Sequence, residues 1–326
     1  ELVPSANIQN NPSKAQNLPQ EKYDFSAVKV ELDNQSQLTY EEFLKITDTD
    51  ALIILKDGII IEERYFHEMA RSTPHILMSV SKSILGLLIG ILIDQKIFKA
   101  ADKVCAILPE LNSTAYKEAT IRDLLDMRTG VTFVEDYLAT SGLMIDYRKA
   151  TNWNPLENNE APSDLRSFYR LLDKKSHPDG KQFNYVSPNS DLLGWIIERS
   201  TGERFSDLLS DLFWKPLGAT MPSYITVDRL GAPRVAGGLC TTAIDLALVG
   251  QLFLDYGFTN GQQILPKNWL QDIQENGSRD AWLEGNFAEY FPNRDMHYRS
   301  KWYVDHGADD SKAELVFGLG VHGQNL

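Results

Sequence analysis

The chain has 326 residues, of which 43% are hydrophobic and 24% charged, and its formal net charge at pH 7 is −13. This composition is typical of a globular protein with enough material for one large domain or two closely packed ones. A charge this negative argues against nucleic acid and against anionic membranes as partners, because both require a basic protein surface. The acidity itself is interpreted as a contribution to solubility.

The first residues form a polar segment. Up to about Lys22 it is rich in Asn, Gln, Pro and Ser, and such a segment cannot bury enough apolar surface to fold by itself. We therefore assign residues 1–24 to a polar tail. Because the chain begins with Glu1, the tail is interpreted as the spacer left by a removed secretion signal, which slightly favours a periplasmic or secreted location. Trimming of a cytoplasmic protein would leave the same start.

Short elements follow the tail in the order strand, helix, strand, strand and helix, at residues 25–32, 38–46, 51–56, 59–66 and 79–95. Thr39 and Glu42 stand in capping-box relation at the start of the first helix. Asp57-Gly58 joins the two central strands and predicts a hairpin. The second helix contains the longest apolar run, which is too short to span a bilayer and predicts a core helix.

The middle of the chain, residues 101–224, is typical of helices joined by Pro, Gly and Asn loops. Amphipathic helices are predicted there and just beyond it, at residues 121–127, 165–172, 191–199 and 243–256, and a strand at 313–324. Strands at both ends with helices between them predict an α/β (α+β) fold. We expect residues 25–100 and 225–326 to form an antiparallel sheet flanked by helices, into which 101–224 is inserted as a mostly helical domain.

Two cysteines, Cys105 and Cys240, lie far apart in the sequence. The sequence has no CxxC pair and no Cys/His cluster, so it predicts neither a zinc site nor a disulfide scaffold. Two free, packed thiols are favoured over a single disulfide.

The candidate for chemistry is Ser79-Val80-Ser81-Lys82 at the start of the apolar helix. Positions i and i+3 share a helix face, so the hydroxyl and the amine can meet. A desolvated lysine can take the proton of a serine, because burial lowers its pKa, and the free N–H groups of a helix start suit an oxyanion. The alternative is a capping serine with a solvated lysine.

A second copy of this spacing, Ser26-Ala27-Val28-Lys29, lies in a strand-like run. There the residues at i and i+3 point to opposite faces, so their groups cannot cooperate. Context therefore selects Ser79 and Lys82.

Three further stretches decide between the alternatives. Residues 183–194 contain Tyr185-Val186-Ser187 before Leu-Leu-Gly, residues 236–247 begin Ala-Gly-Gly-Leu, and residues 121–130 read Ile-Arg-Asp-Leu-Leu-Asp-Met-Arg-Thr-Gly. With the Ser79 motif, and in this order, they resemble the β-lactamase-like, penicillin-recognising family of class C β-lactamases, DD-peptidases and esterases. The resemblance covers about residue 38 to the end. It implies a serine hydrolase that acts on a small amide or ester through an acyl-enzyme on Ser79, without metal or cofactor.

Within this family, the chain resembles the nylon-oligomer (6-aminohexanoate-dimer) hydrolase branch, through Tyr185-Val186-Ser187-Pro188 and Gly320-Val321-His322-Gly323-Gln324. This resemblance implies that Tyr185 shares protons with Lys82 and protonates the leaving amine. A nearby ammonium is expected to lower the tyrosine pKa for this role. It also implies that the N–H groups of Ser79 and Val321 form the oxyanion hole.

The substrate-binding candidates are less specific: Tyr137, Asp146, Ser187, Gly320 and Trp302. By resemblance, Tyr137 is a loop residue that covers the substrate, Asp146 pairs with a substrate ammonium, and Trp302 lines the pocket. The alternatives are an ordinary loop tyrosine, a solvated acid and a core aromatic.

The chain departs from the family's lactamase pattern at its last motif. Gly318-Leu319-Gly320 stands where those enzymes have Lys-Thr-Gly, and Ser187 replaces an asparagine. Without that lysine, binding of β-lactams and peptide termini should be weakened. A β-lactamase or DD-peptidase and a non-catalytic sensor of the same fold remain the alternative functions. Relatives continue beyond this motif, so we expect the closing strands and helix to be missing after Leu326.

Overall fold

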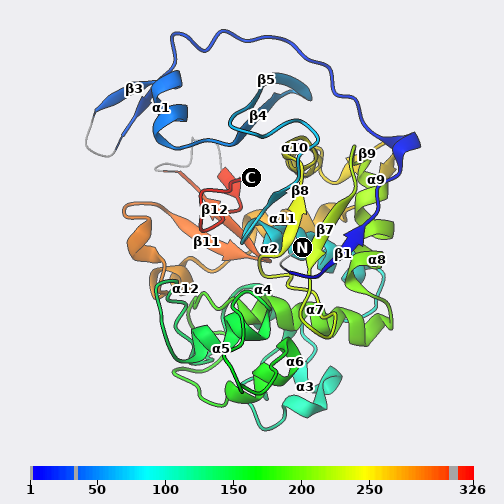
Figure 1. The fold of residues 1–326 in the computed structure, drawn as a ribbon, viewed down its shortest axis with the longest axis vertical. Coiled ribbons are helices and arrows are strands. Elements are labelled where there is room, and N and C mark those ends of the chain that lie inside the picture. The colour runs from blue at the N-terminus through cyan, green and yellow to red at the C-terminus, as the bar shows by residue number, and fades with distance from the viewer. Residues whose placement is uncertain (1–2, 33–35, 308–314) are drawn as a thin grey trace.

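The computed structural model describes residues 3–32, 36–307 and 315–326. Helix α2 (Val80–Asp94) runs through the centre, with α10 (Ala243–Leu254) and α11 (Lys267–Glu275) beside it and most of the strands around them (Figure 1). The helices from the middle of the chain fill the lower part of this view. All pairs between named strands are antiparallel, which confirms the predicted fold class.

The described strands divide into five sheets. The largest sheet has the strand order β1 (Ser5–Ile8), β7 (Ser223–Thr226), β8 (Leu239–Thr241), β6 (His75–Ile76). A three-stranded sheet has the order β11 (Met296–Arg299), β12 (Trp302–Asp305), β13 (Leu315–Phe317). The other three sheets are strand pairs: β4 (Ala51–Lys56) with β5 (Ile59–Tyr65), β2 (Lys29–Glu31) with β3 (Gln37–Thr39), and β9 (Phe258–Thr259) with β10 (Gln262–Gln263). The expectation of one sheet built from both termini is therefore wrong for the described strands. The β4–β5 hairpin instead packs on α10, while β13 pairs with β12.

Two local predictions are confirmed. The β4–β5 hairpin turns at Asp57 and Gly58, whose φ angles of 52° and 76° suit a primed two-residue turn. Helix α1 (Tyr40–Ile46) begins with the capping box: Glu42 N donates to Thr39 Oγ1 at 3.2 Å, and Thr39 N donates to Glu42 Oε2 at 2.8 Å.

The expected polar tail is part of the fold. Strand β1 pairs with β7, and Ile8 is completely buried. Residues 19–23 then run along the edge of β5, where Glu21 N donates to Ile60 O at 2.9 Å. Figure 1 shows this segment crossing outside the β4–β5 hairpin. The prediction of a separate tail is wrong here because sheet edges accept main-chain hydrogen bonds from almost any sequence, whatever its polarity.

The range assigned to the helical domain holds short helices joined by loops: α3 (Val104–Ile107), α4 (Ile121–Leu125), α5 (Leu143–Ala150), α6 (Leu165–Phe168), α7 (Pro188–Thr201), α8 (Phe205–Leu209) and α9 (Lys215–Leu217). Helix α12 (Arg279–Leu283) precedes β11. The helices predicted near residues 121, 165, 191 and 243 are confirmed as α4, α6, α7 and α10. Cys105 and Cys240 are free thiols, as expected.

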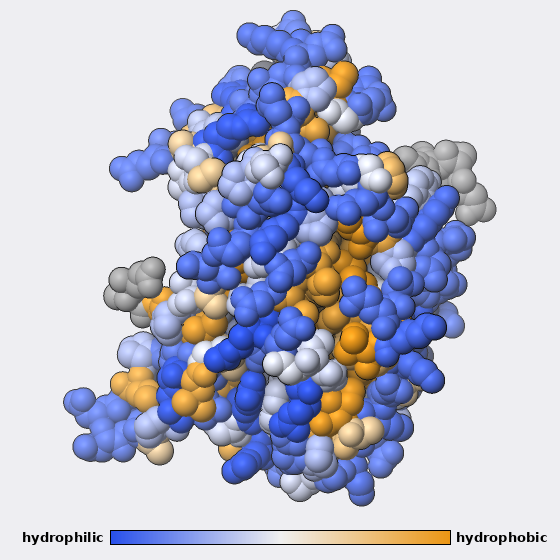
Figure 2. Space-filling view, turned by 90° about the vertical axis from the view of Figure 1, so that its right-hand side faces the viewer, coloured by the Kyte–Doolittle hydropathy of each residue, from blue (hydrophilic) through white to orange (hydrophobic). Residues whose placement is uncertain are grey.

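The surface is mainly hydrophilic. Figure 2 shows the side that bears α8 and α9, where hydrophobic residues emerge in an irregular band between hydrophilic ones. Within the part of the chain that the structure describes, none of the helices combines the length and hydrophobicity needed to cross a lipid bilayer.

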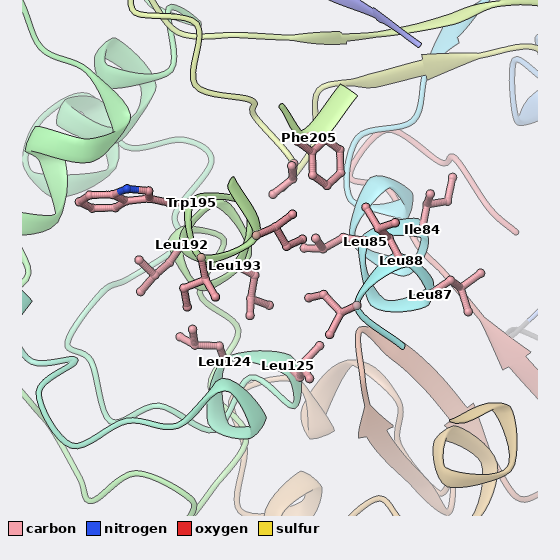
Figure 3. Packing of buried hydrophobic residues seen from close by; sticks show 14 of the residues in the cluster. Ile84, Leu85, Leu87, Leu88, Leu124, Leu125, Leu192, Leu193, Trp195 and Phe205 are labelled. Atoms are coloured by element: carbon pink, nitrogen blue, oxygen red, sulfur yellow. The ribbon is translucent and has the colours of Figure 1, made fainter. Parts of the chain in front are cut away.

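The core is organised around α2, in which every residue from Val80 to Leu92 is buried. Side chains from α2, α4, α7 and the start of α8 meet between these helices (Figure 3). On another side of α2, a Cβ at Gly86 would lie only 2.0 Å from Ser300 O. Glycine at this position therefore lets the turn between β11 and β12 approach the helix.

Candidate active site

Ser79 stands at the start of α2, directly after a strained residue. Met78 has φ of 45°, a left-handed value that is uncommon for a residue with a side chain and that often marks functional sites. The Ser79 side chain does not cap the helix, and Ser79 is partly exposed. Among the described residues, the Ser79 N–H has no acceptor. The serine thus presents both its hydroxyl and its N–H for an incoming group.

Lys82 lies behind the serine. It is 1% exposed, and Nζ donates to Ser79 Oγ at 2.7 Å and to Ala236 O at 2.7 Å. Burial lowers the pKa of Lys82 to about 8, against the opposing charges of Glu135 and Asp191. An amine with this pKa can exist in the neutral form close to neutral pH, as a proton acceptor must.

Tyr185 completes the group. Its side chain is 3% exposed, and the centre of its ring lies 5.0 Å from Lys82 Nζ. Phe287 stacks on the ring at 4.6 Å, and Asn286 Oδ1 accepts a hydrogen bond from Tyr185 N at 3.1 Å. The structure therefore brings the three predicted residues together from α2 and from the loop before α7.

The expected pKa of Tyr185 is wrong in direction. Burial and then the charge of Glu135 raise the pKa of Tyr185, although hydrogen bonds with the Ser79 and Tyr303 side chains lower it in part. Desolvation outweighs the effect expected from a nearby ammonium because the phenolate would be buried. Tyr185 is therefore a neutral phenol that can donate a proton.

Glu135 is a site residue that sequence analysis missed. Its carboxylate accepts from Ser187 N at 2.6 Å, from Ser187 Oγ, and from Tyr137 OH at 2.7 Å. Ser187 directly precedes α7, and the dipole at the start of this helix favours a negative charge. Of the predicted substrate-binding residues, Ser187 and Tyr137 thus lie together around Glu135. An acid two positions before Tyr137 in the same loop was the available signal.

Asp191 was also missed. It is 4% exposed, and its Oδ1 accepts from Ala236 N at 2.8 Å while Tyr147 OH donates to Oδ2. Burial raises the pKa of Asp191 to about 6. By holding Ala236, Asp191 positions the carbonyl that accepts from Lys82.

The glycine segment before the C-terminus runs beside the start of α2. A Cβ at Gly318 would lie 2.7 Å from Ser83 Oγ, and one at Gly320 would lie 3.0 Å from Leu77 O. Val321, which follows, is 44% exposed, and its N–H has no acceptor among the described residues. This placement is compatible with the expected oxyanion hole, which stays a prediction.

Trp302 does not lie with Ser79, Lys82 and Tyr185. It is 2% exposed, packs in the main core and contacts Phe253 with ring centres 5.0 Å apart. The next residue, Tyr303, belongs to the cluster around Tyr185 and hydrogen-bonds to it. Adjacent strand residues face opposite sides of a sheet, so the expectation for Trp302 is wrong and Tyr303 occupies that place.

Asp146 is partly buried in the first turn of α5. Within the described residues, no hydrogen bond or ion pair joins its carboxylate to Ser79, Lys82 or Tyr185. Its role toward a substrate ammonium therefore stays a prediction.

The second copy of the Ser-x-x-Lys motif (SxxK), at Ser26 and Lys29, does not form a pair like Ser79 and Lys82. Ser26 lies in a turn, and Lys29 is an exposed residue at the start of β2. In the described part of the chain, no three His, Cys, Asp or Glu side chains are arranged to share a metal ion.

Comparisons with known proteins agree with this geometry. The β-lactamase family model matches residues 43–320. The chain belongs to the β-lactamase family. It is therefore a serine hydrolase of the β-lactamase-related type.

Two relatives have related names. The 6-aminohexanoate-dimer hydrolase of Paenarthrobacter ureafaciens is 33% identical over 286 residues, which cover 88% of this chain and 71% of that protein. A candidate 6-aminohexanoate-dimer hydrolase from Bacillus anthracis superimposes with a TM-score of 0.87 at 25% identity, covering 99% of this chain and 81% of that one.

The fold is also shared with more distant proteins. A penicillin-binding protein homologue from Pyrococcus abyssi has a TM-score of 0.64 at 16% identity, and the match covers 87% of this chain and 67% of that one. At this identity the likeness shows the fold alone. The predicted family resemblance is confirmed by these comparisons together.

Proposed function

We propose that the chain hydrolyses small linear amides or esters through an acyl-enzyme on Ser79. The observation that carries this proposal is the hydrogen bond of 2.7 Å between Lys82 Nζ and Ser79 Oγ, at a lysine whose pKa burial lowers to about 8. A serine hydroxyl becomes an effective nucleophile when an adjacent base removes its proton, and a neutral amine in contact with it is such a base.

In acylation, neutral Lys82 accepts the proton of Ser79 as Oγ bonds to the substrate carbonyl carbon. The carbonyl oxygen becomes an oxyanion, which the free N–H groups of Ser79 and Val321 can stabilise. Donors of this kind are effective because they are already oriented before the reaction and need no reorganisation.

Expulsion of the leaving group requires a proton at its nitrogen or oxygen. Tyr185 is suited to donate it, since its raised pKa keeps the phenol protonated and its ring lies beside Lys82 and Ser79. The proton on Lys82 then replaces the one that Tyr185 has lost. Water attacks the acyl-enzyme in the second half of the cycle, with the same groups acting in reverse.

The substrate class follows from the relatives and from the last motif. Two proteins of similar sequence are named for hydrolysis of the 6-aminohexanoate dimer, a linear amide. Gly318 and Gly320 offer no side-chain charge where lactamases carry a lysine. We therefore place linear amides and short-chain esters ahead of β-lactams.

Turnover of three substrates by the purified chain tests this assignment. We expect p-nitrophenyl butyrate and the linear 6-aminohexanoate dimer to be hydrolysed with higher kcat/KM than a chromogenic cephalosporin. Faster turnover of the cephalosporin would identify a β-lactamase instead. Failure to hydrolyse any of the three, with binding retained, would identify a non-catalytic module.

The pH dependence of ester hydrolysis provides a further prediction. Only neutral Lys82 can accept the serine proton, so kcat/KM should rise with pH through about 8 and level off above it. At pH 7 roughly one tenth of the molecules would carry the neutral amine. Initial rates at low substrate concentration between pH 6 and 10 measure this profile. A profile that falls over this range contradicts the role of Lys82 as base.

A further inference from the structure

Arg234 lies beside the catalytic group, in the loop between β7 and β8. Its N–H donates to Thr226 O at 2.9 Å, and its carbonyl accepts from Gly238 N at 2.7 Å. A Cβ on Gly237 would lie 3.6 Å from Arg234 Nη2 and also 3.6 Å from the Met78 carbonyl carbon. Only the width of a small side chain therefore separates the guanidinium from the main chain that leads into Ser79.

No acceptor for the Arg234 guanidinium is present among the described residues. Nε and Nη1 of Arg234 are shielded from solvent, and within the described part of the chain no hydrogen-bond partner reaches them. The indole ring of Trp153 lies 4.4 Å from Arg234 Cζ, so the side chain is held against an aromatic face. Arginine stays protonated at any working pH, and leaving buried donors of a charged group unpaired is costly.

The two carboxylates of the candidate site already have donors of their own. Glu135 accepts from Ser187 and Tyr137, and Asp191 accepts from Ala236 and Tyr147. The positive charge of Arg234 acts on Lys82 and Asp191, which places it within the electrostatic reach of the reacting groups. The third nitrogen, Nη2, is not among the shielded atoms and has no acceptor within the described residues, so a ligand can reach the guanidinium there.

We propose that Arg234, held on Trp153, binds a carboxylate of the substrate. This inference rests on the proposed function and specifies the substrate class: linear esters or amides with a carboxylate on the part of the molecule that lies along the β7–β8 loop. An incoming carboxylate matches the planar guanidinium in both charge and geometry. Trp153, which is 38% exposed, forms the outer wall of this subsite.

Two esters with the same acyl chain test the proposal: p-nitrophenyl hydrogen adipate, which carries a carboxylate, and p-nitrophenyl methyl adipate, which does not. We expect the wild type to prefer the anionic ester. In Arg234→Gln the ratio of the two kcat/KM values should fall roughly 10- to 100-fold, as expected for loss of hydrogen bonds to a charged group. Arg234→Lys should retain part of the preference.

Arg199→Gln is the matched control, because Arg199, near the end of α7, pairs with Glu110 and within the described residues contacts none of Ser79, Lys82 and Tyr185. It should keep the wild-type ratio. An equal loss on both esters in Arg234→Gln would show that Arg234 acts only on the charge of Lys82, and it would overturn the proposal. If Arg234→Gln does not fold, the wild type alone decides. A wild-type kcat/KM for the anionic ester that is no higher than for the methyl ester also overturns the proposal.

Failure of the carboxylate subsite and failure of the proposed function give different results with these esters. Hydrolysis of both esters without preference for the anionic one removes the carboxylate subsite and leaves the proposed function intact. Absence of hydrolysis of either ester by the wild type removes the proposed function and the subsite with it.

Discussion

Replacing Ser79 with alanine should reduce ester hydrolysis by roughly 10³-fold or more, because the acyl-enzyme can no longer form. Ser79 is partly exposed at the start of α2 and caps no helix N–H, so the substitution should leave the fold intact. Initial rates on p-nitrophenyl butyrate measure the loss, and thermal unfolding of both proteins checks the structure.

Ser26→Ala is the matched control for this experiment. It removes the serine of the other SxxK copy, which lies in a turn near β2, and it should retain wild-type activity. Covalent labelling provides the second measurement: a fluorophosphonate should modify Ser79 in the wild type and in Ser26→Ala, and mass spectrometry should find no label in Ser79→Ala. A label on another residue would refute the assignment of the nucleophile.

Replacing Lys82 with methionine should lower kcat/KM by about 10²- to 10⁴-fold, the usual contribution of a general base. Methionine fills a similar volume but cannot accept the proton of Ser79. Lys29→Met, at the exposed lysine of the other SxxK copy, is the control and should behave like the wild type. Retention of activity in Lys82→Met would show that another group acts as the general base.

The same variant should not lose stability at pH 7. The pKa of Lys82 falls from 10.5 to about 8 on folding, so burying the ammonium costs about 3 kcal/mol below pH 8. Methionine removes this cost, while Ala236 O loses a hydrogen-bond donor worth about 1–3 kcal/mol. We therefore expect Lys82→Met to be as stable as the wild type at pH 7, or slightly more stable.

The sign of the pH dependence follows from proton binding. Between pH 8 and 10.5 the unfolded chain holds a proton on Lys82 that the folded protein has released, so the stability of the wild type rises with pH in this window. The stability of Lys82→Met relative to the wild type should therefore fall by about 2 kcal/mol between pH 7 and 10. Urea unfolding at the two pH values measures it, and a constant difference would contradict the lowered pKa.

Predictions from sequence held where neighbouring residues decide the structure. The Asp57-Gly58 hairpin, the capping box of Thr39 and Glu42, and the helix that begins at Ser79 all depend on contacts within a few positions of the chain. The i, i+3 spacing of Ser79 and Lys82 likewise brought their side chains into contact. Such features are readable because helix and turn geometry repeat with a short period.

The positions that sequence analysis missed or misplaced depend on distant segments. Glu135 gained its place through Ser187, on the loop before α7, and Asp191 through Ala236, on the loop before β8. Trp302 was expected in the pocket, and Tyr303 lies beside Tyr185 instead, because the pairing of β12 decides which of two adjacent residues faces Tyr185.

The sequence by itself determined the family and predicted the candidate catalytic set, since both follow from motifs and from their order along the chain. Only the tertiary structure decided the protonation chemistry, because pKa values depend on burial: it lowers the pKa of Lys82 and raises that of Tyr185. It also decided the docking of β1 on β7 and the free guanidinium of Arg234. Burial and pairing arise when segments far apart in the chain pack together, and no local pattern encodes them.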